Sequence, residues 1–280
     1  MKTTIHYYII CLLLTISFSA YSQKSLVILH TNDTHSRIEP LPETDRTFPG
    51  RSGVERRAIL IDQIRKENKN VLLFDAGDFL QGTPYFNLFK GEVEIKAMNL
   101  MGYDAVTLGN HEFDYGLEIL EKVAREADFP IVSSNYDFSQ TKLKKLIKPF
   151  IILKRGGVRI GVIGINIQPK GLIAADNYKG VKFMDPVKTA NEMADLLLTK
   201  YKCDMIVCLS HLGYNGDLNL AESTKGIDLI IGGHSHTYLK EPAVRKNTDN
   251  KDVKIFQTNG RGIYVGRLDI EMEKVQVNKR

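Results

Sequence analysis

The histidines of this 280-residue chain recur at one kind of position. Short β-branched or leucine-rich runs predict strands, and five of the seven histidines follow the carboxyl end of such a run within a few residues. Asp and Asn side chains share that position. The set is Asp33, His35, Asp78, Asn110, His111, His211, His234 and His236. Because the carboxyl ends of strands converge on the ligand crevice of an open α/β sheet, we expect these side chains to meet.

Imidazole and carboxylate groups are the ligands that suit Zn²⁺, Mn²⁺ or iron. Asp33-Thr34-His35 and His234-Ser235-His236 each place two donors on one tight segment. Each piece alone is commonly a turn or a surface group, but five such pieces follow successive strands. With His111 set aside, seven donors remain, which are too many for one tetrahedral ion and suit two ions with open positions.

His111 differs from the other histidines because Asp114 stands three residues later, within one helical turn. This spacing predicts a carboxylate that orients the imidazole and raises its basicity. The alternative is that Asp114 caps the helix that follows. We interpret His30, inside a predicted strand, as a core or edge histidine whose ring is satisfied, and Asn166 as a turn residue.

The elements that position these residues alternate between strands and helices, which predicts an α/β layered fold. Strands are predicted at residues 26–30, 71–74, 104–108, 131–133, 158–165, 205–209 and 229–231. Helices are predicted at 54–66, 92–101 and 117–126, and another opens at Asp185-Pro186. Residues 255–257 and 264–272 predict a terminal β-meander that closes the sheets. Loops 39–52 and 142–148 are expected to be solvated surface.

Composition restricts the class of protein further. Hydrophobic residues make up 43% and charged residues 25%, which excludes collagens and low-complexity polymers. The net charge of +5 is spread along the sequence, so we expect no nucleic-acid polymer as a partner. Cys203 and Cys208 flank a predicted strand too far apart for a disulfide, which leaves the core or a metal to stabilise the chain.

The first 22 residues have the pattern of a secretory signal peptide. Lys2 precedes an apolar stretch from residue 7 to 18, and Ala20-Tyr21-Ser22 is a small-x-small cleavage site. The alternative is an uncleaved membrane anchor, but the apolar run is shorter than the ~20 residues that a spanning helix needs. We therefore expect an exported protein, periplasmic or extracellular, that begins at Gln23 and has no membrane span.

The five motifs resemble the blocks of the calcineurin-like metallophosphoesterases. They are Asp33-Thr34-His35, Gly77-Asp78, Gly109-Asn110-His111-Glu112, Ser210-His211 and Gly232-Gly233-His234-Ser235-His236. The longer stretches 30–35, 77–84 and 110–116 are similar to the secreted 5′-nucleotidase branch. The resemblance extends from Leu26 to about Met272 and implies a four-layer αββα sandwich with two mixed β-sheets.

The resemblance also implies a dinuclear metal site, with zinc or manganese expected and iron or cobalt as alternatives. By motif position, one ion would be held by Asp33, His35, Asp78 and His236, and the other by Asp78, Asn110, His211 and His234. Asp78 would bridge. Asn110 and His111 would contact the substrate, and His111, paired with Asp114, would stabilise the transition state or protonate the leaving oxygen. A metal-bound hydroxide would attack phosphorus in line.

The implied substrate is a small phosphate ester, and 5′-nucleotides are expected. Two-domain members of the branch continue with a C-terminal nucleoside-binding domain, whereas we expect residues 23–280 to form the catalytic domain alone. A separate chain could then supply nucleoside binding. Tyr85, Phe86 and Phe89 are interpreted as the buried face of a short helix. Alternatives are a phosphodiesterase or 2′,3′-cyclic nucleotide phosphodiesterase of the same fold, an enzyme that cleaves a sulfur ester, or a metal-stabilised subunit of an assembly.

Overall fold

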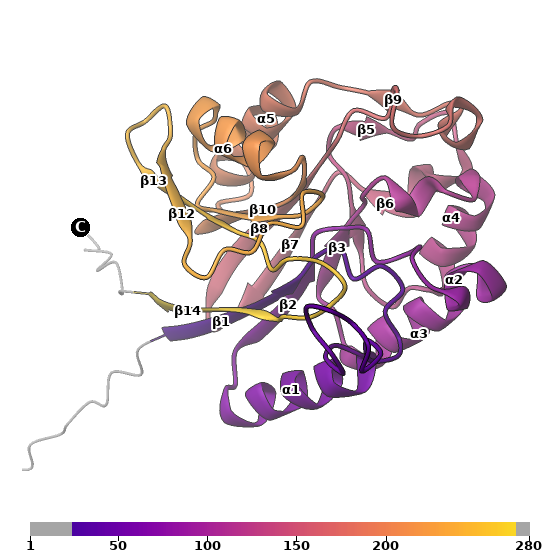
Figure 1. Ribbon diagram of the computed structural model, residues 1–280. Helices are drawn as coiled ribbons and strands as arrows, with labels where there is room; N and C mark the ends of the chain where they lie inside the picture. Colours follow the sequence, from indigo (N-terminus) through magenta and orange to yellow (C-terminus); the bar gives the residue numbers. More distant parts are fainter. Residues whose placement is uncertain (1–23, 273–280) are drawn as a thin grey trace, which may run out of the picture.

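The computed structural model describes residues 24–272, and two large β-sheets lie face to face at its centre (Figure 1). The first sheet has the strand order β14-β1-β2-β3-β4-β6. β14 is antiparallel to β1, and the other neighbours in this sheet are parallel. Its strands are β1 (Lys24–Thr31), β2 (Val71–Asp75), β3 (Ala105–Thr107), β4 (Ile131–Val132), β6 (Ile147–Lys148) and β14 (Gly266–Met272).

The second sheet has the order β12-β13-β11-β10-β8-β7. Its four central strands are parallel, and the two edge strands run antiparallel to their neighbours. Its strands are β7 (Phe150–Arg155), β8 (Val158–Asn166), β10 (Met205–His211), β11 (Leu229–Gly232), β12 (Ala243–Lys246) and β13 (Asp252–Phe256). A separate antiparallel pair joins β5 (Tyr136–Asp137) and β9 (Lys182–Phe183).

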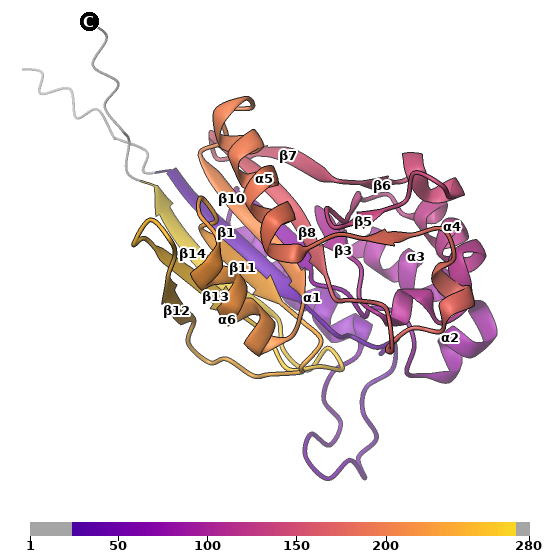
Figure 2. The ribbon, with the colours of Figure 1, turned by 90° about the horizontal axis from the view of Figure 1, so that it is seen from above.

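Helices cover the outer face of each sheet, as Figures 1 and 2 show. α1 (Val54–Glu67), α2 (Pro84–Phe89), α3 (Glu92–Met101) and α4 (Gly116–Glu126) lie on the side of the first sheet. α5 (Pro186–Thr199) and α6 (Tyr214–Ser223) lie on the second. Short 3₁₀ helices span His111–Phe113 (η1), Lys142–Lys145 (η2) and Ala175–Tyr178 (η3). The expected four-layer αββα sandwich with two mixed sheets is therefore confirmed.

The alternation of side chains along the strands builds three apolar cores. In β1, Leu26 and Ile28 face the second sheet, whereas Val27 and Leu29 face the helices. The side chains of β10 alternate in the same way, since Val207 packs between the sheets whereas Ile206 and Cys208 pack under α5 and α6. Strands covered on both faces read as continuous hydrophobic runs, which is why the sequence identified the central strands.

The predicted helix ends are largely confirmed. The Asp185 side chain accepts a hydrogen bond from the Lys188 amide at 2.7 Å, so it caps α5 as the Asp-Pro pair indicated. Gly102 ends α3 in a left-handed conformation, with φ at 65°. Cys203 and Cys208 are both free and buried, in agreement with the absence of a disulfide between them.

The predicted terminal β-meander is wrong. β13 lies in the second sheet, parallel to β11, whereas β14 lies in the first sheet, antiparallel to β1. The alternating pattern identified both strands, but alternation does not state which sheet a strand joins. The connection from 257 to 265 passes between the sheets at their carboxyl edge, where the Arg261 amide donates to the Asp33 carbonyl oxygen at 2.6 Å.

Other differences concern short or peripheral elements. The predicted loop 142–148 contains η2 and β6, and α6 fills a stretch for which no helix was predicted. In α2 only Phe86 is buried, and Phe89 is 46% exposed, so the interpretation of Tyr85 and Phe89 as part of a buried face is wrong.

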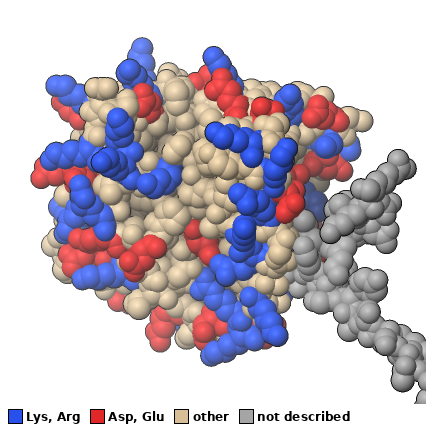
Figure 3. All heavy atoms as spheres, turned by 180° about the vertical axis from the view of Figure 1, so that it is seen from behind, with Lys and Arg blue, Asp and Glu red and all other residues tan. Residues whose placement is uncertain are grey.

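The surface and the chain ends complete the description. On the face drawn in Figure 3, Lys and Arg side chains lie interspersed with Asp and Glu. Within residues 24–272, no helix has the length and apolar composition of a membrane span. The predicted signal peptide and its cleavage before Gln23 lie outside the described residues.

Candidate metal centre

Each predicted donor lies at the carboxyl end of a parallel strand. Asp33 and His35 follow β1, Asp78 follows β2, and Asn110 follows β3 in the first sheet. In the second sheet His211 is the last residue of β10, while His234 and His236 follow β11. The two sheets present these ends at the same edge of the sandwich, so donors from five segments meet.

The backbone at these donors is strained. Asp33, His35, Asp78, His234 and His236 all have positive φ, between 48° and 72°. Non-glycine residues rarely adopt this conformation, and it persists where surrounding contacts hold it, commonly at functional sites. Here the Asp33 amide donates to Gly77 O at 2.9 Å and the His35 amide to Asp78 O at 3.0 Å. The amide of His234 donates to the Asp33 carboxylate at 3.0 Å.

Asp33, His35 and His236 form one group of potential ligands, with ligand atoms within 4.8 Å of one another. The Nε2 atoms of the two imidazoles lie 2.9 Å apart, and Nε2 of His236 lies 3.5 Å from Oδ1 of Asp33. Nitrogen lone pairs and a carboxylate that converge in this way fit a shared cation. The group matches three of the four donors expected for the first ion.

Asp78, His211 and His234 form another group within the same 4.8 Å limit. Nδ1 of His211 lies 2.7 Å from the Ala76 carbonyl oxygen, an acceptor that fixes the proton on Nδ1 and leaves Nε2 as a lone pair. That Nε2 is buried, makes no hydrogen bond of acceptable geometry, and lies 3.1 Å from Oδ2 of Asp78. Oδ1 of Asn110 lies 3.0 Å from Nδ1 of His234. All four donors expected for the second ion are thus together.

His111 lies beside both groups and partly faces solvent. It shares a third group of potential ligands with His35 and Asp78. Nδ1 of His111 lies 2.8 Å from Oδ2 of Asp114, with the two side chains 31% and 35% exposed. Asp114 does not cap α4, whose N-cap is Tyr115. The predicted pairing therefore exists, while its role in chemistry stays a prediction.

Without cations, protons compensate the charge of this cluster. Burial lowers the pKa of His211, but the Asp78 carboxylate outweighs burial and raises that pKa to about 10. Burial raises the pKa of Asp78, but the charge of His211 outweighs it and holds the pKa well below its usual range. Burial raises the pKa of Asp33 to about 6. A buried cluster of carboxylates and imidazoles whose pKa values are shifted in this way is a candidate site for a divalent cation.

Comparison with known proteins agrees with this geometry. A family model described as calcineurin-like phosphoesterase matches residues 26–238. The chain belongs to the calcineurin-like phosphoesterase family. It is 32% identical to a 5′-nucleotidase of Diplobatis ommata, over 97% of this chain and 50% of that protein. It is 35% identical to the 5′-nucleotidase of Bos taurus, over 89% of this chain and 47% of that protein.

A solved structure of a related protein has the same fold as this calcineurin-like phosphoesterase. The 5′-nucleotidase precursor from Thermus thermophilus superposes with a TM-score of 0.83 at 38% identity. The alignment covers 89% of this chain and 52% of that structure. The chain spans about half the length of the curated relatives named above. Membership of the family supports the prediction that the chain is a hydrolase.

Two polar residues differ from their predicted roles in this phosphoesterase-family chain. Asn166 is a buried residue at the end of β8, where its amide donates to Oγ1 of Thr107 at 3.0 Å and its backbone amide donates to Asn135 at 2.7 Å. It therefore links the end of β8 to the end of β3 and to the segment between β4 and β5, and the interpretation as a turn residue is wrong.

His30 is buried, as predicted, but its ring is not satisfied. Neither ring nitrogen has a hydrogen-bond partner within the described part of the chain. The ring packs edge-on against Phe256, and Gly266 of β14 lies opposite. Burial lowers the pKa of His30 to about 3, so the imidazole is neutral at ordinary pH.

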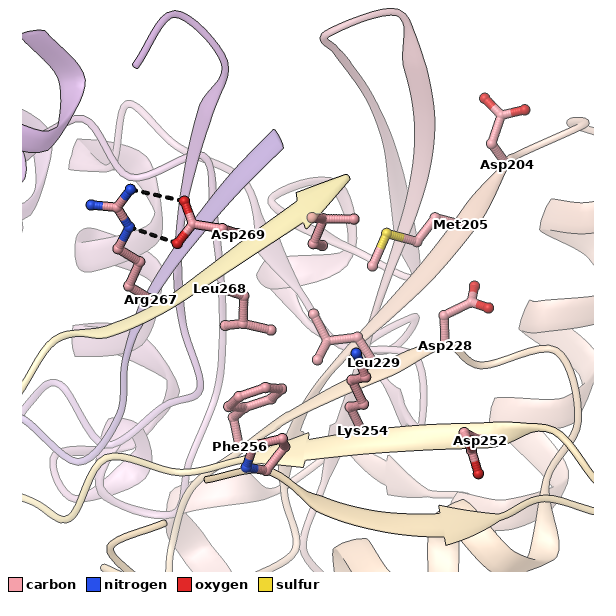
Figure 4. A pocket seen from close by; sticks show the side chains of 12 residues that line it. Asp204, Met205, Asp228, Leu229, Asp252, Lys254, Phe256, Arg267, Leu268 and Asp269 are labelled. Atoms are coloured by element: carbon pink, nitrogen blue, oxygen red, sulfur yellow. Dashed lines mark hydrogen bonds and ion pairs between the residues drawn. The ribbon is translucent and has the colours of Figure 1, made fainter. Parts of the chain in front are cut away.

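A large cavity lies away from the metal centre, at the other end of the strands (Figure 4). It holds about 380 Å³ and is lined by Met205 and Leu229, the first residues of β10 and β11. Leu268 of β14 closes it from the first sheet, beside the Arg267–Asp269 ion pair. Since none of the predicted donors lines it, this cavity is not part of the candidate site.

Proposed function

We propose that this chain is an exported, two-metal phosphoesterase that hydrolyses phosphate esters, with 5′-nucleotides as its substrates. One observation carries the proposal. Two groups of ligands, Asp33–His35–His236 and Asp78–His211–His234, lie side by side at the carboxyl edge of the sandwich. Oδ1 of Asp33 in the first group lies 4.0 Å from Nε2 of His211 in the second group.

The donor set supports divalent metals without stating which. Nitrogen and oxygen ligands with no thiolate among them suit zinc or manganese, and iron or cobalt would also fit. When bound, two such ions supply Lewis-acid polarisation and charge neutralisation at phosphorus. Asp78 is the carboxylate placed to be shared, because it belongs both to the group with His211 and to the group with His35.

Residues of this chain would position the bound ester and donate hydrogen bonds to it. His111 stands at the exposed rim with its Nδ1 held by Asp114, which leaves the other ring nitrogen to face a bound ester. The hydrogen bond that Nδ1 of His111 donates to Asp114 raises the pKa of His111 to about 9, so both ring nitrogens carry a proton at neutral pH. A protonated imidazole there can donate to a phosphoryl oxygen or to the leaving oxygen. Asn110, beside it, would contact both metal and substrate.

The relatives support nucleotide monoesters as the substrate class, since those named above are 5′-nucleotidases. The test is release of inorganic phosphate from adenosine 5′-monophosphate by the purified chain. We expect release that stops after chelation and returns when zinc or manganese is added back. Release that persists in the metal-free protein would contradict the proposal.

A second candidate is cleavage of nucleotide diesters. One relative, 32% identical over 91% of this chain and 19% of its own length, is named "Trifunctional nucleotide phosphoesterase protein" and comes from Bacillus subtilis. The same assay with 2′,3′-cyclic nucleotides and an aryl phosphodiester separates the two candidates. Faster turnover of a diester than of the monoester would make the second candidate the better description.

A third reading is a metal-stabilised subunit that works with a separate chain carrying a nucleoside-binding domain. A purely structural subunit needs neither His111 nor Asp114, so their pairing supports chemistry within this chain. Phosphate release by the chain alone would exclude the subunit reading. Release only after a partner chain is added would support it.

Export and domain limits complete the proposal. Residues 1–22 would direct export, and residues 23–280 would form the catalytic domain. Two relatives that are 34% identical are named snake venom 5′-nucleotidase, which is consistent with a protein that acts outside the cell. Mass spectrometry of the protein recovered outside the cytoplasm should give a first residue of Gln23. A retained Met1 would favour the anchor alternative.

A further inference from the structure

Glu112 has a buried carboxylate that lies between two of the loops of the metal centre. Its side chain is 1% exposed. Oε2 accepts hydrogen bonds from the Asp78 amide at 2.9 Å and the Gly109 amide at 2.5 Å. Oε1 accepts one from the Leu80 amide at 3.1 Å. One carboxylate therefore holds three backbone amides that no helix or strand would satisfy.

The three amides belong to two different loops. Asp78 and Leu80 follow β2, whereas Gly109 follows β3. A second contact ties the same loops, because the His111 amide donates to Oδ1 of Asp78 at 2.8 Å. The Glu112 carboxylate and the Asp78 carboxylate thus hold the loops together from opposite directions. Each carboxylate accepts an amide hydrogen from the other loop, so the two contacts together restrain the separation of the loops.

The loops also have no room to shift toward each other. A Cβ atom at Gly109 would lie 2.1 Å from Oδ1 of Asp78 and 2.6 Å from Nε2 of His211. A Cβ at Gly77 would lie 2.5 Å from the Gly109 amide. Sterics therefore set the shortest separation of the two loops, and the hydrogen bonds to Glu112 prevent a longer one.

We propose that Glu112 is a positioning residue that fixes the distance between Asp78 and the segment Asn110–His111, and so sets the geometry of the two-ion site. The proposal rests on the proposed function for the identity of the ligands. Glu112 itself touches neither substrate nor metal in this account. It acts on both ions through Asp78 and on the substrate through His111.

The informative substitution is Glu112→Gln, which keeps the shape and removes one acceptor. The amide NH₂ of glutamine cannot accept, so it would face the Leu80 amide or the Asp78 and Gly109 amides donor to donor. Either orientation leaves at least one of these three amides without its acceptor. A matched control is Asp104→Asn at the other end of β3, where the Asp104 carboxylate accepts a hydrogen bond from the Leu73 amide at 2.9 Å. Asp104 lies at the opposite end of its strand from the predicted ligands.

The experiment measures cobalt binding to the full chain by chelator competition and the visible spectrum of the cobalt-loaded protein. For Glu112→Gln we expect metal affinity about 10- to 100-fold weaker, the usual effect of a lost outer hydrogen bond, and an altered cobalt spectrum. For Asp104→Asn both should match the wild type even if the unfolding midpoint falls. Unchanged affinity and spectrum in Glu112→Gln would overturn the proposal.

A measurement on the unaltered chain covers the case in which Glu112→Gln does not fold. Amide hydrogen exchange should find the amides of Asp78, Leu80 and Gly109 among the slowly exchanging ones in the metal-free protein. Exchange as fast as in an open loop would overturn the proposal. Absence of phosphate release by the wild type would refute the proposed function and not the role of Glu112. The hydrogen-exchange rates of the three amides would still test that role.

Discussion

At the scale of single residues, the centre is distinguished by what its side chains lack. Nε2 of His211 and Nδ1 of His35 are buried without a hydrogen bond of acceptable geometry. Buried polar atoms are normally satisfied, so two such exceptions in one place call for an explanation. The proposed pair of cations would provide one, and it would also account for the strained backbone at the same residues.

His111→Ala tests the division of roles between ligands and donor. We expect the variant to keep its metal and to lose activity by about 10²- to 10⁴-fold, the usual share of a positioned proton donor. Metal content and phosphate release are measured on the same preparation. Loss of metal would mean that His111 is a ligand, as its place in the group with His35 and Asp78 permits.

Asp114→Asn should have a smaller effect through the same imidazole. The asparagine oxygen can still accept from Nδ1 of His111, but it carries no charge, so we expect about a 10-fold loss of activity at unchanged metal content. The comparison with His111→Ala is made at one pH and one metal concentration. An equal loss in both variants would show that Asp114 does more than orient the ring.

The residue types and their positions after strands were enough to predict which side chains meet at the candidate metal centre, because potential metal ligands have a narrow chemistry. The roles of Glu112 and Asn166 were not predicted, because they depend on which backbone groups lie opposite their side chains. The sequence does not state how loops that are far apart along the chain are aligned in the fold. The unsatisfied ring of His30 was not predicted for a related reason, because a lone histidine within a strand does not reveal whether its ring nitrogens find partners.

At the scale of elements, the pairing of β1 with β14 depends on a small residue. His30 of β1 lies opposite Gly266 of β14, and a Cβ at Gly266 would come within 2.0 Å of the imidazole. The central strands were predictable because each is a continuous apolar run. The sheet that β13 and β14 join was not, since edge pairing is decided by tertiary packing.

Gly266→Ala should therefore destabilise the fold by about 1–3 kcal/mol, the usual cost of overpacking. The measurement is the free energy of unfolding in urea. The double variant with His30→Ala should recover most of that loss relative to His30→Ala alone, because the clash needs both side chains. Equal losses in the two backgrounds would refute the clash.

His30 also predicts a pH dependence of stability. Its pKa is about 3 in the folded protein and 6.5 in the unfolded chain, so between these values the unfolded chain binds one more proton. The contribution of His30 to stability is complete above pH 6.5 and is lost as the pH falls toward 3, at about 1.4 kcal/mol per pH unit. Urea unfolding in chelator should give a shallower pH slope for His30→Ala than for the wild type. Equal slopes would contradict the burial of a neutral imidazole.

At the scale of the whole molecule, the sandwich brings the carboxyl edges of two separate sheets together. Asp33, Asp78 and Asn110 come from the first sheet, whereas His211 and His234 come from the second sheet. Alternating strands and helices predict layers, but only the family resemblance predicted that two sheets would share one edge. The metal should consequently hold the two sheets together.

Chelation should lower the unfolding midpoint of the wild type. An ion that binds only the folded chain stabilises it by about 2.7 kcal/mol at a concentration 100 times its dissociation constant. Differential scanning calorimetry with and without chelator, followed by addition of zinc or manganese, measures this effect. A midpoint that does not move would mean that the cluster holds no metal in solution.

The central claim is a pair of ions that share Asp78, and elemental analysis of metal content per chain tests it most directly. The wild type, purified in zinc or manganese and freed of loose ions, should hold two ions per chain. Asp78→Ala should hold none and should lose nearly all phosphate release, because both sites lose a ligand at once. A wild type with fewer than two ions, or an Asp78→Ala chain that keeps two, would contradict the account.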